Sequence, residues 1–469
     1  MSTAAVAPRY RLHHLAIALI VSLEYLQTMM VAFGAGRISH GLHATAQQFS
    51  LAAAGYAAVA VLMILSHRWW VQRLGYRTML RLSLLAFGAG ALLCALSQTA
   101  GDFIVARMVQ ALGGAAFFTA SRVQIMHYRG RERLQAMLFL PGGIMLGSGL
   151  APILAAGLLT VTGWQALFWV LLPLVALADY VVRQAVPEAE PVANERPDRL
   201  HPWGLALLAA GVFLLQWVLE RARFELAAHG ALLWSLGLLA GVLLLLHLRH
   251  EWRRPVPLVP YRRFTSERYL WGMAVYGVAY VVMSACGYVL PLYMAQGLGL
   301  SLLHSGWLLG GSGLLALPFA ILHLKLMLRW PHLRRFLLAG ALLLALAAAL
   351  LAHSATGGGW QLAAGLLLFN GLFLPFFLGT TAAATFSHVD EQVFSHAYQV
   401  KNAMREVASA LGLSWAVLIL QQRSDAHLAA QPELAAGPLL LLAGQDFFYG
   451  LLLLALCIGV LLRLQRRFV

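Results

Sequence analysis

The side chains best suited to chemistry in this chain are a few ionisable groups inside long apolar stretches. Glu24 and Gln27 interrupt the stretch that begins near His14, and their i,i+3 spacing places them on one helix face. Arg107 and Gln110 have the same spacing in a later stretch. An ionised group at the centre of a bilayer costs about 2.5–3.5 kcal/mol or more, so such groups usually have a partner or a function. These residues are the first candidates for a functional site.

Glu24 is the leading candidate for a group that takes up and releases a proton. It lies in the middle of its apolar stretch, one helical turn before Gln27, and it supplies a carboxylate to that face. The structural alternative is an ion pair between Glu24 and a buried base such as Arg107. We favour the proton-carrying role because acids inside membranes are functional by default.

A second polar cluster lies late in the chain. Lys401 and Arg405 are spaced i,i+4, as are Asn402 and Glu406, so each pair shares a helix face. Two positive charges with one acid could attract an anionic substrate group. We favour a simpler interpretation, in which Lys401 lies at the membrane surface and the acids of the preceding loop pair with arginines there.

A further set of aromatic and weakly polar residues is expected to line a cavity for amphipathic small molecules. The predicted lining residues are Gln27, Tyr56, Gln110, Tyr288, Tyr293, Asn370, Asn402, Arg405 and Glu406. The structural alternative for such side chains is packing, or a belt of aromatic residues at the membrane interface.

The elements that must position these residues are apolar segments of about 20 residues, each long enough to cross a bilayer. Fourteen such segments predict an all-α membrane protein; they begin near residues 14, 47, 78, 102, 134, 164, 202, 228, 268, 301, 335, 359, 393 and 445. Most of the 33 basic residues fall in connectors on one side, which predicts that both termini are cytoplasmic.

The segments divide into six, two and six. We expect an N-terminal six-helix bundle over residues 1–185, a linker with two extra transmembrane helices over 186–265, and a C-terminal six-helix bundle over 266–469. Paired bundles of this kind are typical of secondary transporters, whose substrate site lies near the membrane midplane.

Composition excludes several classes of protein. The chain is 61% hydrophobic and 11% charged, and its net charge of +15 is not gathered in a separate basic domain, so nucleic-acid binding is not expected. The 17 histidines lack metal-ligand spacing, and no metal or cofactor is expected. The chain also lacks the phosphate-binding Gly-x-x-x-x-Gly-Lys-Ser/Thr motif, so an ion gradient is the expected energy source.

Two motifs carry a resemblance to a known family. The segment Arg107-Met-Val-Gln110-Ala-Leu-Gly113 resembles the Arg-x-x-Gln-Gly-x-Gly motif of major facilitator transporters. Gly147-x-x-x-Ala151-Pro152 resembles their antiporter motif Gly-x-x-x-Gly-Pro, with alanine in place of a glycine. With the 6+2+6 plan, the chain resembles the fourteen-helix drug:proton antiporters of the EmrB/QacA type.

The resemblance implies proton-coupled export of small amphipathic or lipophilic compounds by alternating access in the inner membrane, with protons and membrane lipids as further partners. It gives Arg107 a role in proton coupling beside Glu24. Members of the EmrB type work with a periplasmic adaptor and an outer-membrane channel, and 421–445 is the longest outer connector available for docking. The chain departs from the family pattern at Gln27, where an aspartate is usual.

Three alternatives stay open. The first is an exporter of one specific metabolite, siderophore or lipid. The second is an intramembrane transferase, for which His247, His250 and Glu251 are the nearest candidates, although they match no motif. The third is a sensor that has lost transport, which the absence of the usual aspartate would permit.

Overall fold

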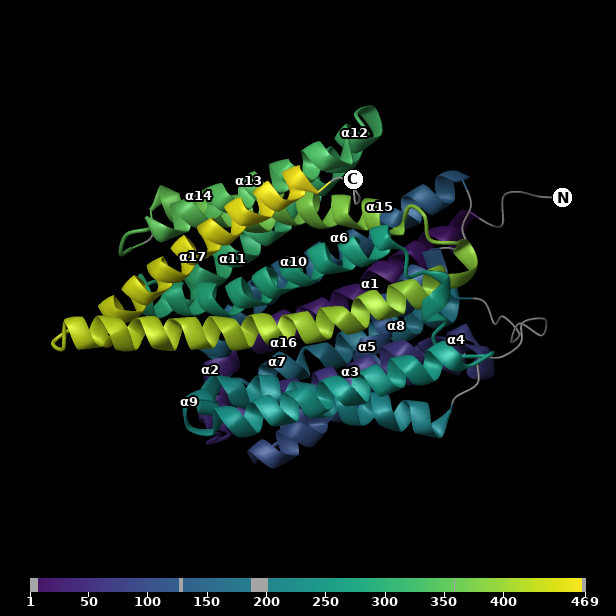
Figure 1. The fold of residues 1–469 in the computed structure, drawn as a ribbon, viewed down its shortest axis with the longest axis horizontal. Helices are drawn as coiled ribbons and strands as arrows, with labels where there is room; N and C mark the ends of the chain where they lie inside the picture. The colour runs from purple at the N-terminus through teal and green to yellow at the C-terminus, as the bar shows by residue number, and fades with distance from the viewer. Residues whose placement is uncertain (1–6, 126–129, 187–200, 358, 466–469) are drawn as a thin grey trace. The chain divides into compact units, whose positions relative to one another are not determined.

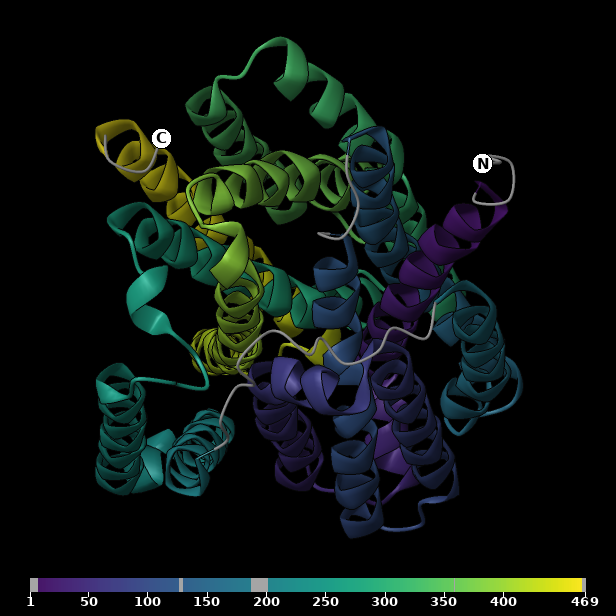
Figure 2. The same cartoon turned by 90° about the vertical axis from the view of Figure 1, so that its right-hand side faces the viewer.

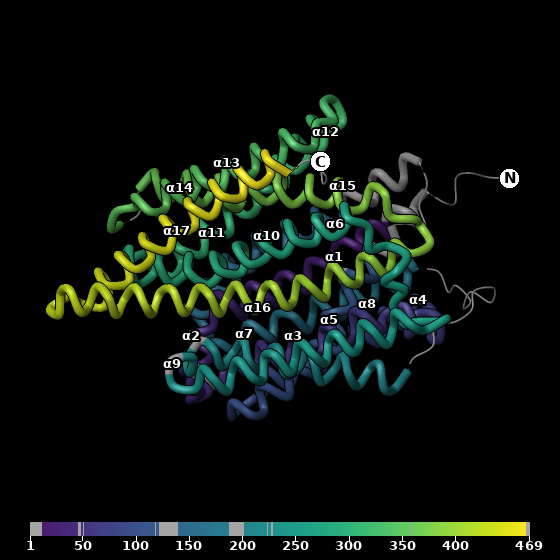
Figure 3. The backbone as a smooth tube through the Cα atoms, viewed as in Figure 1, coloured from purple at the N-terminus to yellow at the C-terminus, as the bar shows by residue number. Residues whose placement is uncertain are grey.

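The computed structural model describes residues 7–125, 130–186, 201–357 and 359–465, and within these ranges the regular elements are helices (Figures 1 and 3). Fourteen helical segments among them are long and apolar enough to cross a membrane. The prediction of an all-α protein with fourteen spans is confirmed. The segments come from hydropathy alone, so this part of the architecture follows directly from composition.

The helices group into two compact units. The first comprises Met1–Gly147, Val161–Phe264 and Asp390–Val407. Its helices are α1 (Ala7–Phe33), α2 (Ala35–Gly41), α3 (Ala46–Leu74), α4 (Tyr76–Leu96), α5 (Ala100–Ile125), most of α6 (Gly130–Val161), α7 (Ala166–Trp169), α8 (Leu171–Ala185), α9 (Pro202–Arg253), η1 (Tyr261–Arg263) and the first part of α16 (Glu391–Ala430). Inside this unit α5 packs against α1, α3 and α4, while α1 also packs against α8.

The second unit comprises Ser148–Thr160, Thr265–Val389 and Ala408–Val469. Its helices are α10 (Glu267–Leu292), η2 (Tyr293–Gly297), α11 (Leu302–Leu314), α12 (Ala316–Arg329), α13 (Leu333–Ala352), α14 (Trp360–Leu366), η3 (Leu367–Gly379), α15 (Thr380–Phe386), α17 (Ala436–Leu464) and the remainders of α6 and α16. Here α13 packs against α17 and η3, and α10 packs against α15. The division into bundles at 1–185, 186–265 and 266–469 stays a prediction.

The two extra spans form a hairpin within α9. His229, at the start of the span Ala228–Arg253, has non-helical backbone angles (φ −127°, ψ 28°), and the chain reverses direction here after the span Pro202–Ala222. Gly211 lies against Leu244, and Gly237 lies against Val218, so the two arms run antiparallel (Figures 1 and 2). Glycine permits this close approach because it carries no Cβ.

A buried carboxylate holds the connector that leaves the hairpin. Glu251 accepts hydrogen bonds from the backbone N–H groups of Leu258 (2.6 Å) and Val259 (3.4 Å). His247 contacts the Tyr261 hydroxyl at 3.3 Å, and burial, followed by the charge of Glu251, raises the pKa of Tyr261. We call Glu251, His247 and Tyr261 the connector clasp. Two of the groups considered for an intramembrane transferase, His247 and Glu251, thus have structural partners.

The longest predicted outer connector is much shorter than expected. Helix α16 continues to Ala430 and α17 begins at Ala436, so most of 421–445 is helical. The expectation of a long non-helical connector there is wrong, and a docking role for this segment stays a prediction. The physical reason is that no glycine or proline interrupts 421–430, and an ion pair between Arg423 and Asp446 (2.7 Å) fastens the two helix ends together.

Candidate functional site

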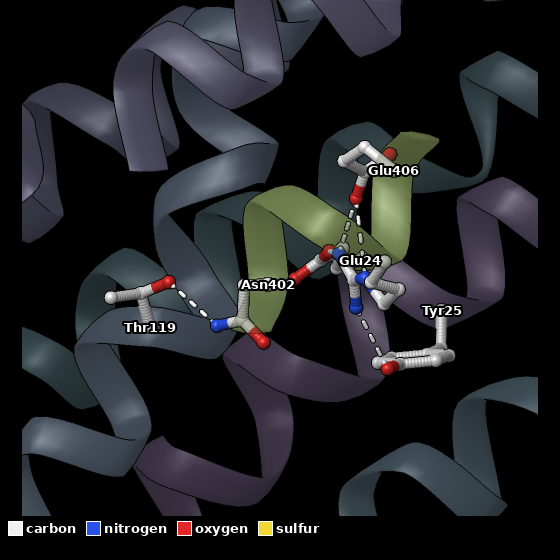
Figure 4. A network of polar contacts seen from close by, with 6 residues as sticks. Glu24, Tyr25, Thr119, Asn402 and Glu406 are labelled. Carbon is white, nitrogen blue, oxygen red and sulfur yellow. Dashed lines mark hydrogen bonds and ion pairs between the residues drawn. The ribbon is translucent and has the colours of Figure 1, made fainter. Parts of the chain in front are cut away.

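Glu24 lies on α1 in an ion pair that connects α1 to α16 within the first unit. The Nη2 atom of Arg405 donates to Glu24 at 2.7 Å and to Glu406 at 2.6 Å, and Nη1 donates to the Tyr25 hydroxyl at 2.8 Å (Figure 4). The Arg405 and Glu24 side chains are 8% and 5% exposed. We call Glu24, Arg405 and Glu406 the buried triad.

The triad holds more negative than positive charge when fully ionised. One guanidinium faces two carboxylates, so the group carries a net charge of −1, and uptake of one proton makes it neutral. Like charges held close together in a medium of low polarity disfavour double ionisation. The role of Glu24 in proton coupling stays a prediction.

The Arg107 guanidinium lies in a neutral environment on α5. It donates to Gln110 Oε1 at 2.5 Å and lies 4.4 Å from the centre of the Tyr56 ring. The Gln27 amide faces it, and with its oxygen turned toward the cation it accepts from Nη2 at 3.0 Å. Among the residues that the structure describes, no carboxylate pairs with Arg107. The structure therefore contains the ion pair between Glu24 and a buried base that the structural alternative described, with Arg405 rather than Arg107 as the base.

Lys401 is buried within the protein, and its depth in the membrane stays a prediction. Lys401 is only 2% exposed, and its Nζ atom lies 4.6 Å from the centre of the Tyr398 ring. Helix α16 begins ten residues earlier, at Glu391, so Lys401 lies well inside the helix. Asp390 in the preceding loop accepts a hydrogen bond from the backbone N–H of Gln392 (3.1 Å), which caps the helix start.

Asn402 links α16 to α5 one turn before the triad. Its Nδ2 atom donates to the Thr119 hydroxyl at 2.9 Å, and both residues are fully buried (Figure 4). The same two helices therefore carry Arg405 and Arg107. The structure brings together, in one unit, all the predicted site residues from α1, α3, α5 and α16.

Comparison with known proteins now adds the family. The sequence model of the Major Facilitator Superfamily matches residues 17–413, which is most of the chain. The chain belongs to the Major Facilitator Superfamily. Its family and its structural relatives are transporters.

Several bacterial members of the superfamily resemble this chain in sequence. MdtD of Pectobacterium atrosepticum, a protein named for multidrug resistance, is 25% identical over 379 residues, which is 80% of each chain. MdtD of Cronobacter sakazakii is 25% identical over 93% of this chain and 90% of its own. The drug efflux pump JefA of Mycobacterium tuberculosis is 28% identical over 64% of this chain and 59% of its own.

Solved structures of the superfamily share the fold. The human organic anion transporter MFSD10 has a TM-score of 0.64 at 16% identity and covers 96% of this chain and 99% of its own. The peptide transporter PepTSo has a TM-score of 0.62 at 14% identity and covers 97% of this chain and 99% of its own. At these identities the likeness shows the fold alone.

The residues that resemble the superfamily's antiporter motif allow close helix packing. A Cβ on Gly147 would lie 2.5 Å from the Ser22 carbonyl oxygen of α1. Later in α6, the Pro152 carbonyl lies against Gly306 of α11. Small residues at such positions let helix backbones approach each other in lipid. The structure thus gives this motif a packing role.

Three predicted lining residues belong to the second unit, where they have local surroundings. The Tyr293 hydroxyl donates to the Leu351 carbonyl at 3.0 Å, and Asn370 Nδ2 donates to the Ser312 hydroxyl at 3.0 Å. Tyr288 is half-buried on α10. Their role in a substrate cavity stays a prediction.

Two members of the polar network were not predicted from the sequence. Tyr25 adjoins Glu24 in sequence and binds Arg405, and Thr119 binds Asn402. Tyrosine and threonine are common in membrane helices, so neither residue carries a signal of its own. The acid at Glu24 is the one sequence signal that points to Tyr25.

Proposed function

We propose that this protein is a proton-coupled exporter of small amphipathic or lipophilic compounds, working by alternating access. The observation that supports the proposal is the buried triad, in which the Glu24 and Glu406 carboxylates lie beside the charge of Arg405. The sequence relatives named for multidrug resistance and drug efflux support the substrate class.

Coupling follows from the electrostatics of the triad. When Glu24 is ionised, its attraction to Arg405 connects α1 to α16. When Glu24 takes up a proton, the charge–charge attraction is lost and Arg405 keeps only Glu406 as an ionised partner. The strength of the α1–α16 contact therefore depends on proton occupancy, which is the property that a proton-driven conformational change requires.

The proposed setting is the inner membrane, with both termini in the cytoplasm. The support is the concentration of arginines in alternate connectors, because basic residues favour the cytoplasmic side. A periplasmic adaptor and an outer-membrane channel are proposed as partners by analogy with EmrB-like members. Co-purification from cells that express such an adaptor tests this part separately.

The proposed function can be tested in liposomes that contain the purified protein and an imposed pH gradient. We expect the wild type to move amphipathic compounds from a defined panel against the proton flow. Glu24→Gln should abolish the gradient-dependent part, because an amide cannot carry the proton. The matched control is Glu225→Gln, which removes the acid of the Arg221–Glu225 pair on α9 and should transport like wild type.

The panel also separates the proposal from its alternatives. Transport of one metabolite, siderophore or lipid, and of no other panel compound, would favour the specific exporter. A folded wild type that moves no compound with or without the gradient would support the transport-inactive sensor. Full gradient-driven transport by Glu24→Gln would remove the proton-carrying role of Glu24.

A further inference from the structure

The surroundings of Arg107 contain hydrogen-bond donors without acceptors. The Tyr56 hydroxyl and the Gln110 Nε2 atom are both buried, and neither has a hydrogen-bond partner among the described residues. An unpartnered buried polar group costs about 1–3 kcal/mol, so two of them beside one guanidinium call for a physical explanation.

The Arg107 guanidinium, the Gln110 amide and the Tyr56 hydroxyl lie together where α3 packs against α5. Arg107, Gln110 and Gly114 are spaced i, i+3 and i+7 on α5, which places them along one side of the helix. The Tyr56 ring stacks on the Arg107 guanidinium, and its hydroxyl lies 2.7 Å from where a Cβ on Gly114 would be. An apolar cluster that includes Ala111 and packs around Tyr56 holds this tyrosine in place.

The carboxylates of the site are already occupied. Glu24 and Glu406 both bind Arg405, so the buried acids of the triad do not neutralise Arg107. Arg107 is only 6% exposed, and its other contacts are the neutral side chains of Gln27, Gln110 and Tyr56. A group that offers only acceptors and a negative charge would satisfy both the charge and the open donors.

We propose that Arg107, Tyr56 and Gln110 form a subsite for an oxyanion carried by the transported compound, so that the cargo class is amphipathic organic anions. A carboxylate or sulfonate group accepts hydrogen bonds from the guanidinium, the phenol and the amide, and its apolar body lies against the surrounding helices. The inference rests on the proposed exporter function for its consequence in transport, but the binding itself requires no gradient.

Binding is tested with three probes of the same size and different charge: 2-naphthoate, neutral 2-naphthamide and cationic 2-naphthylmethylammonium. Their affinities for the purified wild type are measured in detergent by isothermal titration calorimetry. We expect 2-naphthoate to bind about tenfold to a hundredfold more tightly than the amide, the range expected for one charge-assisted contact. Equal or tighter binding of the amide or the ammonium compound would overturn the proposal.

Variants test whether the preference for 2-naphthoate over 2-naphthamide depends on Arg107 and Tyr56. Arg107→Gln should remove the advantage of 2-naphthoate and leave the affinity for 2-naphthamide unchanged. Tyr56→Phe keeps the ring, removes only the hydroxyl and should reduce 2-naphthoate binding several-fold, so it tests the site even if Arg107→Gln does not fold. The matched control is Arg221→Gln, which removes an arginine that also stacks on an aromatic ring, that of Trp217. Equal losses for all three probes, or the same loss in the control, would show a structural role and refute the subsite.

Failure of the subsite and failure of the proposed function give different results. If Glu24→Gln keeps the 2-naphthoate preference but loses gradient-driven transport, both ideas stand. If the preference holds and no variant or wild type transports any probe, the exporter function falls and the subsite remains. If transport is proton-driven but indifferent to probe charge, the subsite falls and the exporter function remains.

Discussion

Arg405 provides the most direct test of the buried triad. Replacing it with methionine keeps an unbranched side chain but removes the charge that Glu24, Glu406 and Tyr25 bind. Removing one partner of a buried ion pair costs about 3–5 kcal/mol, and the exposures of 8% and 5% place this pair in that class. We therefore expect Arg405→Met to reduce the free energy of unfolding by about 3–5 kcal/mol, or roughly a hundredfold to several thousandfold in the equilibrium constant.

The measurement is reversible unfolding in mixed micelles with increasing dodecyl sulfate, followed by tryptophan fluorescence at neutral pH. The control Arg221→Met breaks the partly exposed pair with Glu225 and should cost below about 1 kcal/mol. The double variant Glu24→Gln/Arg405→Met should recover part of the loss, because a neutral amide replaces an unpaired carboxylate, with a coupling of about 0.5–3 kcal/mol. A loss no larger than that of the control, or no coupling between the two positions, would refute the reasoning.

Three further outcomes are expected. Gly147→Ala should reduce stability by about 1–3 kcal/mol, because its Cβ would meet backbone, whereas Gly157→Ala on the same helix meets nothing within 4 Å and should be neutral; the same micelle titration compares them. In a background without native cysteines, Glu433→Cys should react with a membrane-impermeant maleimide on intact cells, and Glu267→Cys only after permeabilisation; the reverse pattern would invert the proposed orientation. Lys401→Cys should resist a small water-soluble maleimide under conditions in which Glu433→Cys reacts fully, since Lys401 is buried, and rapid labelling would contradict its placement.

The spans could be predicted from sequence because the bilayer imposes one simple requirement, a run of apolar residues long enough to cross it. The errors arose where helices continue beyond the apolar run. Helix α16 runs from Glu391 to Ala430, so hydropathy placed its start correctly, near residue 393, but predicted a connector where its last turns are helical. Helix ends of this kind are set by backbone capping and packing, which local hydropathy does not report.

The sequence alone identified Glu24 in the candidate site but not the residue that pairs with it. An acid in an apolar stretch identifies Glu24, but its partner Arg405 lies 381 positions later in the chain, and no local pattern connects them. The sequence offered Arg107 as an equally reasonable base. Only the Arg405–Glu24 contact in the structure decides between the two, and the hydrogen bond from Arg405 beside it reveals the contribution of Tyr25.

The connector clasp changes how the chain after the hairpin responds to proteases. Arg253, Arg262 and Arg263 would make a loose segment an easy target for trypsin, which needs an extended stretch of backbone in its cleft. Here the Glu251 carboxylate accepts hydrogen bonds from the backbone amides of Leu258 and Val259, so cleavage requires these hydrogen bonds to break first. One acidic side chain thereby protects a region with three trypsin sites.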